Sequence, residues 1–290
     1  MTAWKPAGHQ AWPAAAQAAA PHAVAAPVIE LRGVGYSYPG QRRPAEPQPA
    51  DGEPAASLGR RALGPVRTPR RRAAQHSRDG RPGPALNLVD LTVLAGELVT
   101  LTGPPRSGRS TLLSVIALLL RPMTGSYLLA GHDTALLGDR DRAALRGRQL
   151  GLVSEPAQLL LSRTVLDNVM LPLLYTGTPA SHRTGAALAA LDRVGLAASA
   201  QVEACFLSAG ERQLVAIARA LVTEPALLLC DSPGASLDPE LAAQIIGLLT
   251  HLHAGGTTVL IATRDQLAAA YGSRCVPIGG SAGMEENPLR

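Results

Sequence analysis

Through the last two thirds of the chain, continuous apolar runs alternate with segments whose apolar residues recur at helical spacing. Buried strands are predicted where apolar and β-branched residues follow one another, at 97–102, 226–230 and 257–262. Asp238 and Pro239 mark the N-cap and first-turn proline of a helix between the last two strands. That helix has apolar residues at i, i+4, i+7 and i+11, namely Leu241, Ile245, Leu248 and Leu252. Strands that alternate with helices favour an α/β fold, with a mainly parallel sheet covered by helices.

The first third of the chain lacks this alternation. Residues 1–27 are rich in Ala and Pro and are predicted to form a disordered tail. After a β-prone stretch at 28–38, residues 41–84 hold ten arginines and four acidic residues but few large apolar side chains. Such a segment cannot bury enough surface to offset its ordering entropy. The predicted organisation is one domain at 28–278, interrupted by a disordered Arg- and Pro-rich insertion at 41–84 and followed by a flexible C-terminus at 279–290.

The basic character of the chain is concentrated in that insertion. Its net charge of +6 exceeds the +5 of the whole chain, so the other residues are almost neutral together. A basic loop could contact nucleic acid or an anionic membrane surface. However, no aromatic residues interleave these arginines to stack on bases. A solvated insertion is the favoured interpretation, and the composition argues against nucleic acid as a partner.

Composition also excludes several classes of protein. With 290 residues, 46% of them hydrophobic, the chain can build a sizeable core. Its longest apolar stretch falls far short of the roughly 20 residues that span a bilayer, and its N-terminus lacks the pattern of a secretory signal. Three cysteines are too few and too scattered for a disulfide scaffold or a zinc site. These features predict a cytoplasmic protein.

A glycine-containing loop lies between the predicted strand 97–102 and a helix-like apolar run that starts at Ser110. Glycines let backbone N–H groups curl around phosphate oxygens, and a hydroxyl at the end of such a loop suits Mg²⁺. The frame is G-x₄-G-R-S, with arginine where a phosphate-binding lysine is expected, and its planar fork is larger than an ammonium group. Taken alone, a plain strand–turn–helix junction accounts for the loop equally well. The predicted nucleotide-binding residues are Gly103, Pro104, Pro105, Arg106, Ser107, Gly108, Arg109, Ser110 and Thr111.

Two later segments add to this pattern. Ser208 and Glu211 have the spacing of a helix capping box, so a purely structural role accounts for them as well. Farther on, Asp231 ends a predicted buried strand, where its carboxylate is well placed to hold Mg²⁺, usually through water. The candidate residues here are Leu207, Ser208, Ala209, Gly210 and Glu211, then Asp231, and then Ser236, Leu237 and Asp238.

In this order and at these distances, the three segments resemble the phosphate loop, the signature and the magnesium strand of ABC-type ATPases. Four more positions fit the same frame. Glu155 lies where the Q-loop has a glutamine, and Tyr38 matches the aromatic residue that stacks on adenine. Arg264 lies where the switch histidine is expected, and residues 236–238 match the D-loop. Residues 164–174 resemble the lipoprotein-release and macrolide-export branch of the family.

The resemblance covers about residues 28–278 and carries its own expectations. It implies a P-loop NTPase core of ABC-ATPase type, with a small antiparallel β region and a helical subdomain around 140–215. It implies ATP and Mg²⁺ as ligands, with Ser110, Asp231 and, as an alternative, Glu155 near the metal.

The chain departs from the family pattern mainly at its chemical positions. Arg109 replaces the phosphate-loop lysine, Glu155 the Q-loop glutamine, and Ala209 the first glycine of the signature pair. Ser232 replaces the glutamate that polarises the attacking water, and Arg264 replaces the switch histidine. A serine hydroxyl is a poor general base at neutral pH, so weak hydrolysis is expected. Two alternatives stay open: a general replacement of lysine by arginine explains Arg109, and Glu155 serves as a surrogate base or metal ligand.

A nucleotide site has two halves, the phosphate-loop side of one subunit and the signature of the other, and the departures are concentrated on the phosphate-loop side. Family members pair head to tail, so a signature acts on the nucleotide of the opposite subunit, and Ser208, Gly210 and Glu211 are retained. The resemblance implies an ATP-binding subunit of an ABC transporter. It would lie on the inner face of the membrane through a permease and pair with an identical or different ABC ATPase. The alternatives are a non-hydrolysing pseudo-ATPase partner or regulator and a non-transport ABC protein that contacts nucleic acid.

Overall fold

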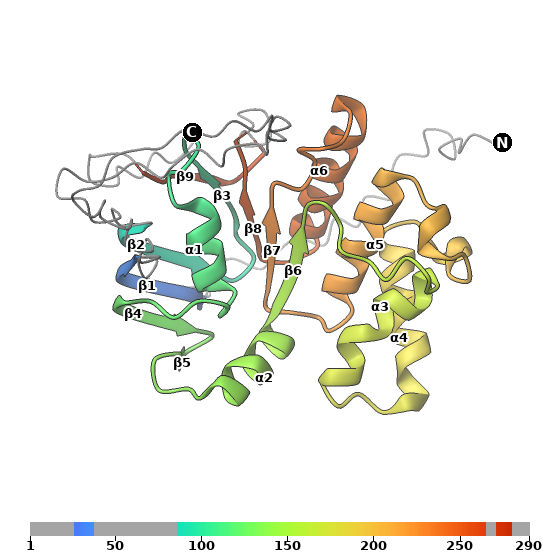
Figure 1. The fold of residues 1–290 in the computed structure, drawn as a ribbon, viewed down its shortest axis with the longest axis horizontal. Helices are drawn as coiled ribbons and strands as arrows, with labels where there is room; N and C mark the ends of the chain where they lie inside the picture. The colour runs from blue at the N-terminus through green and yellow to red at the C-terminus, as the bar shows by residue number, and fades with distance from the viewer. Residues whose placement is uncertain (1–25, 38–85, 265–270, 280–290) are drawn as a thin grey trace, which may run out of the picture.

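The structure is a computed structural model in which two β-sheets share an apolar core and helices gather mainly around one of them (Figure 1). It describes residues 26–37, 86–264 and 271–279. The predicted insertion at 41–84 and the candidate adenine contact Tyr38 lie outside the described residues. Nearly all of the predicted tail at 1–27 and C-terminus at 279–290 lies outside them too.

The first sheet is antiparallel and has four strands in the order β2-β1-β4-β5. Along β2, Val89, Leu91 and Val93 are buried while their neighbours are exposed, as expected for a sheet with one face on the core. This sheet is the small antiparallel region that the resemblance implied. Its strands are β1 (Pro27–Tyr36), β2 (Leu86–Leu94), β4 (Thr124–Leu129) and β5 (His132–Asp133).

The second sheet is parallel and has five strands in the order β6-β7-β8-β3-β9. Three of them confirm the buried strands predicted from apolar runs. The strands are β3 (Leu98–Thr102), β6 (Leu150–Ser154), β7 (Leu227–Asp231), β8 (Val259–Ala262) and β9 (Arg274–Pro277).

Both faces of the central strands β3, β7 and β8 are buried, which explains why these strands are almost continuously apolar rather than alternating. On β7, Leu227 and Leu229 pack into a core shared with the first sheet and the helix after β3. Leu228 and Cys230 face the opposite core, which is lined by the helices after β6 and β7. The parallel sheet is therefore the rigid layer from which the connecting loops extend.

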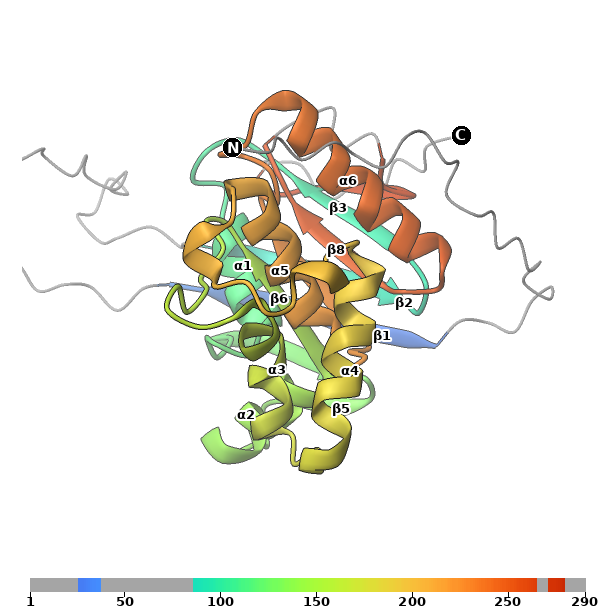
Figure 2. The same cartoon turned by 90° about the vertical axis from the view of Figure 1, so that its right-hand side faces the viewer.

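Six α-helices complete the described part of the chain, and α3, α4 and α5 lie beyond the β6 edge of the parallel sheet (Figures 1 and 2). As predicted, Asp238 caps the helix after β7, accepting a hydrogen bond from the Leu241 N–H at 2.9 Å, with Pro239 in the first turn. None of the helices in the described ranges is long and apolar enough to cross a membrane. The helices are α1 (Arg109–Ile116), α2 (Asp139–Gln149), α3 (Val165–Tyr175), α4 (Ala180–Arg193), α5 (Ala209–Leu221) and α6 (Pro239–Ala254).

The strand register brings four chain segments to one edge of the parallel sheet. Ser154 pairs with Asp231, Asp231 with Ala262, and Ala262 with Leu101. All four strands run in the same direction, so the loops that follow β3, β6, β7 and β8 leave from the same edge. The carboxyl edge of an open parallel sheet is where ligands bind in such folds.

Candidate functional site

The loop after β3 packs so closely on the C-terminal segment that two positions require glycine. A Cβ on Gly103 would overlap the carbonyl oxygen of Ile278, and one on Gly279 would lie 2.6 Å from the Cβ of Ser107. Both glycines have positive φ, 152° and 91°. Gly103, the first glycine of the G-x₄-G frame, is thus a backbone requirement of this fold.

The same loop ends at the N-terminus of α1, where Gly108 is the N-cap, with a φ of 96°. Glycine brings no side chain to the cap, so an anion can take the capping place at the positive end of the helix. Within the loop, Arg106 adopts a φ of 68°, a conformation that costs a residue with a Cβ about 1–3 kcal/mol. The cradle fits a phosphate group, although Arg106 makes it strained.

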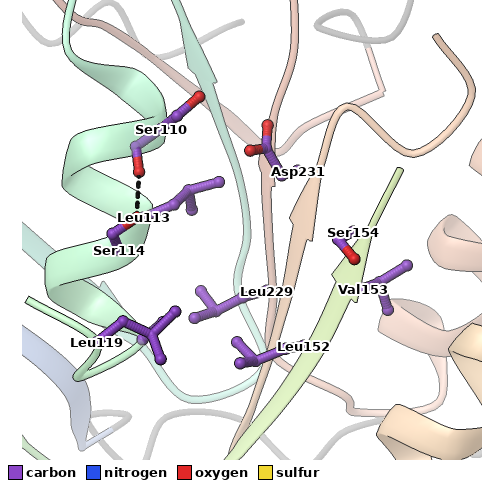
Figure 3. A pocket seen from close by; sticks show the side chains of 10 residues that line it. Ser110, Leu113, Ser114, Leu119, Leu152, Val153, Ser154, Leu229 and Asp231 are labelled. Atoms are coloured by element: carbon purple, nitrogen blue, oxygen red, sulfur yellow. Dashed lines mark hydrogen bonds between the residues drawn. The ribbon is translucent and has the colours of Figure 1, made fainter. Parts of the chain in front are cut away.

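Ser110 and Asp231 lie at the same end of a pocket between α1 and the strands β6 and β7 (Figure 3). The pocket has a volume of about 170 Å³, and its other walls are mostly apolar, including Leu152 and Leu229. Hydroxyl and carboxylate oxygens are the ligands that Mg²⁺ prefers, and Mg²⁺ takes only one or two of them from the protein beside phosphates and water. Among the described residues there is no group of three or more His, Cys, Asp or Glu side chains that could hold a metal. The pair fits Mg²⁺ that arrives with a nucleotide.

Arg109, at the position of the expected lysine, is buried, and its guanidinium donates a hydrogen bond to the carbonyl oxygen of Thr263 at the end of β8. Desolvation by burial, and then the nearby positive charge of Arg264, lower the pKa of Arg109, while Asp231 acts in the opposite direction. The exposed Arg264 follows Thr263 directly. One of the five N–H donors of the guanidinium is therefore already bonded to the protein, and this bond restricts how the group can turn toward a phosphate.

Ser232 follows β7 at the position of the expected water-polarising glutamate. Its hydroxyl donates to the Asp231 carboxylate at 3.2 Å, and its φ is 52°. The hydroxyl thus points its proton at the metal-binding candidate, and it is a weak base at neutral pH. Ser232 therefore does not replace the glutamate as a base for the attacking water.

Glu155 follows β6 and is held by a segment almost 80 positions later in the chain. Its Oε2 accepts from the N–H groups of Gly234, at 2.7 Å, and Ala235, and its Oε1 accepts from the N–H and hydroxyl of Ser236. Glu155 also lines a different pocket from Ser110 and Asp231. The structure therefore brings Ser110 and Asp231 together but engages Glu155 with residues 234–236, at the start of the D-loop, a contact that no sequence pattern indicated.

The signature segment forms the start of α5. Ser208 and Glu211 make the capping box that their spacing allowed: Ser208 Oγ accepts from the Glu211 N–H at 3.3 Å, and Glu211 Oε2 accepts from the Ser208 N–H at 2.8 Å. Ser208 and Ala209 remain exposed, whereas Gly210 is buried and a Cβ there would lie 3.3 Å from Leu241. The capping role thus coexists with a signature that is open to a partner.

The family described as ABC transporter matches residues 86–235, which is just over half of the chain. An ABC transporter ATP-binding protein of Bacillus subtilis, YknY, is 39% identical over 67% of this chain and 84% of its own length. The macrolide export ATP-binding/permease protein MacB 1/2 of Paracoccus denitrificans is 39% identical over 66% of this chain and 28% of its own length.

Solved structures give the same result. The dimeric ATP-binding cassette MJ0796, in a post-hydrolysis state bound to ADP and Pi, matches with a TM-score of 0.69 and 27% identity. That match covers 90% of this chain and 99% of the other. In contrast, the chain spans about a third of the length of the longer curated relatives, whose names join an ATP-binding and a permease part.

Proposed function

Since this chain belongs to the ABC transporter family, we propose that it is the ATP-binding subunit of an ABC exporter whose own site binds ATP and Mg²⁺ but hydrolyses ATP weakly. The observation that carries the proposal is the edge of the parallel sheet, where a glycine cradle and the Ser110–Asp231 pair lie beside substituted positions. The names of the relatives support export, since they include macrolide and pyoverdine exporters.

In this proposal, different residues at the carboxyl edge of the parallel sheet bind the phosphates and the metal. The backbone of 103–108 and the N-terminus of α1 bind phosphate oxygens, and Ser110 and Asp231 provide oxygen ligands for Mg²⁺. Mg²⁺ bound with the nucleotide neutralises the charge of the phosphates. Arg109 adds positive charge to the phosphate-binding end of the site. Tyr38 stays a predicted adenine contact.

We also propose the assembly that this division implies. The domain at 28–278 pairs head to tail with a second ABC ATPase, on the inner face of the membrane through a permease. The exposed signature at Ser208 and Ala209 then completes the partner's site. The dimeric form of the MJ0796 cassette supports such pairing.

A second function is favoured by one observation. Ser232 donates a hydrogen bond to Asp231 and is a poor base, and both oxygens of Glu155 accept hydrogen bonds from residues 234–236. With no carboxylate free at this site to take a proton from water, the chain would act as a non-hydrolysing pseudo-ATPase partner that supports turnover in an intact subunit.

Calorimetry with ATP, with and without Mg²⁺, tests nucleotide binding by the purified chain. We expect weak binding that strengthens with Mg²⁺, and Asp231→Asn should remove that gain. No ATP binding at millimolar concentration would contradict the proposal. A mixture with the ABC ATPase encoded nearest to this chain then separates the two functions. When that partner is catalytically inactivated, a chain that hydrolyses ATP in its own site still gives ATP turnover in the mixture. A pseudo-ATPase gives none.

A further inference from the structure

The contact between Glu155 and the D-loop is a built site for a carboxylate. Three successive N–H groups, of Gly234, Ala235 and Ser236, point at its two oxygens, and the Ser236 hydroxyl adds a fourth donor. Consecutive N–H groups that converge in this way form an anion-binding concavity. Hydrogen bonds from N–H to an ionised carboxylate are roughly twice as strong as neutral ones.

This geometry requires glutamate rather than the glutamine expected at this position. An ionised carboxylate only accepts hydrogen bonds, and it has two oxygens for donors on either side. Glutamine would keep one acceptor oxygen and turn an NH₂ group toward either the Gly234 and Ala235 N–H groups or the two donors of Ser236. Glutamate in place of glutamine at position 155 therefore fits the N–H and hydroxyl donors that surround it.

Both sides of the contact are fixed to the body of the protein. On the Glu155 side, the Arg219 guanidinium of α5 donates to the carbonyl oxygen of Gln158 at 2.6 Å. The buried Asn168 of α3 bonds both the N–H and the carbonyl of Leu160, at 2.8 and 3.0 Å. On the other side, the D-loop runs directly into α6, which Asp238 caps. Glu155 therefore joins two anchored segments.

We propose that Glu155 is a positioning residue: it fixes the D-loop and the two residues before it, 234–238, in the conformation that contacts a second ABC ATPase, and it is neither a metal ligand nor a base for the chain's own site. The four donors match the roughly four lone-pair sites of a carboxylate, so Glu155 would have to release the D-loop to act elsewhere. The consequence for a partner rests on the proposed function, whereas the positioning role in the free chain does not.

Amide hydrogen exchange of the full chain without nucleotide, followed by NMR, tests the role directly. The Ser236 amide is the best probe, because the N–H groups of Gly234 and Ala235 also lie 2.7 and 3.1 Å from the Ser232 carbonyl. Glu155→Gln and Glu155→Ala should each speed exchange at Ser236 by about tenfold or more. Glu240→Gln, at an exposed position in the first turn of α6, makes the same charge change nearby and should leave it unchanged.

A second measurement separates positioning from metal binding. Loss of a metal ligand or of its support costs about 10- to 100-fold in affinity, whereas the positioning role predicts that Glu155→Gln leaves Mg²⁺-dependent ATP affinity almost unchanged. Unchanged Ser236 exchange in both Glu155 variants would overturn the proposal. So would a tenfold loss of Mg²⁺-dependent ATP binding in Glu155→Gln. If the unmodified chain binds no ATP, the proposed function fails, and the exchange result still decides the role of Glu155.

Discussion

The phosphate-loop side and the signature side of this chain differ in what their polar side chains already hold. On the phosphate-loop side, Arg109 is bonded to a carbonyl at the end of β8, Ser232 to Asp231, and Glu155 to the D-loop. On the signature side, Ser208 and Glu211 bond only each other as the cap of α5, with Ser208 exposed. Each of these three substituted residues has thus found a partner inside its own protein, whereas the retained Ser208 is exposed. This contrast supports a chain that completes another subunit's site better than its own.

The largest effect is expected from restoring the phosphate-loop side. Arg109→Lys, Ser232→Glu and Arg264→His together should raise ATP turnover of the isolated chain by about 100-fold or more, in the range that a positioned general base supplies. Each single change should do little, because the three groups act on the same phosphate and its water. Steady-state phosphate release measures the rate.

Two controls sharpen that result. Adding Asp231→Asn to the triple variant should abolish the gain, because the metal pair with Ser110 is lost. A triple variant that folds, binds ATP and still shows no turnover would mean that the phosphate-loop side is impaired by more than these residues.

The next largest effect concerns the signature side. Ser208→Ala should lower the turnover of an intact partner ATPase mixed with this chain by about tenfold, the loss of one good contact of about 1.4 kcal/mol to the reacting phosphate. It also removes a helix cap, at a cost of about 1 kcal/mol in the free energy of unfolding.

Thr164→Ala is the matched control, because Thr164 and Asp167 form the same capping box on α3. It should lower stability as much as Ser208→Ala while leaving the partner's turnover unchanged. Equal losses of turnover in the two variants would show that Ser208 acts only as a cap.

A smaller effect is expected for nucleotide affinity. Arg109→Lys alone should tighten ATP binding several-fold, about 1 kcal/mol, since lysine presents a compact charge on a flexible stem and is not tied to the Thr263 carbonyl by a planar fork. Calorimetry against Arg32→Lys, an exposed position on β1, provides the comparison. Weaker binding by Arg109→Lys would show that the guanidinium is the better phosphate ligand here.

The smallest effect concerns packing beneath Ser110 and Asp231. Ser154 on β6 lines the pocket there, and Ser154→Val adds apolar volume and a β-branched residue to a strand. We expect a gain of about 0.5–1 kcal/mol in the free energy of unfolding, measured by urea denaturation. Ser126→Val, on an exposed strand position of β4, should gain less. If the two variants gain equally in the free energy of unfolding, strand propensity alone explains the effect.

The sequence was informative where a local pattern determines the structure. The apolar runs of β3, β7 and β8 and the Asp238-Pro239 cap were predicted, because burial and capping depend on neighbouring residues. The apolar run after Ser110 predicted a helix, but α1 ends at Ile116, since Leu118 adopts a left-handed φ of 57° and turns the chain toward β4.

The contacts that distinguish this chain lie beyond local patterns. Glu155 and Ser236 are 81 positions apart, and Arg109 and Thr263 are 154 apart. Only the register of the parallel sheet brings them to one edge. The sequence therefore showed that these positions are substituted, and the fold was needed to show which groups they contact.

The most direct measurement is the ATP turnover of the unmodified chain with Mg²⁺, beside that of Glu155→Ala. We expect the unmodified chain to hydrolyse ATP barely above background, because Ser232 is a poor base and Glu155 is bonded to the D-loop. We also expect Glu155→Ala to be no slower. Robust turnover by the unmodified chain, abolished by Glu155→Ala, would contradict this account and make Glu155 the working carboxylate.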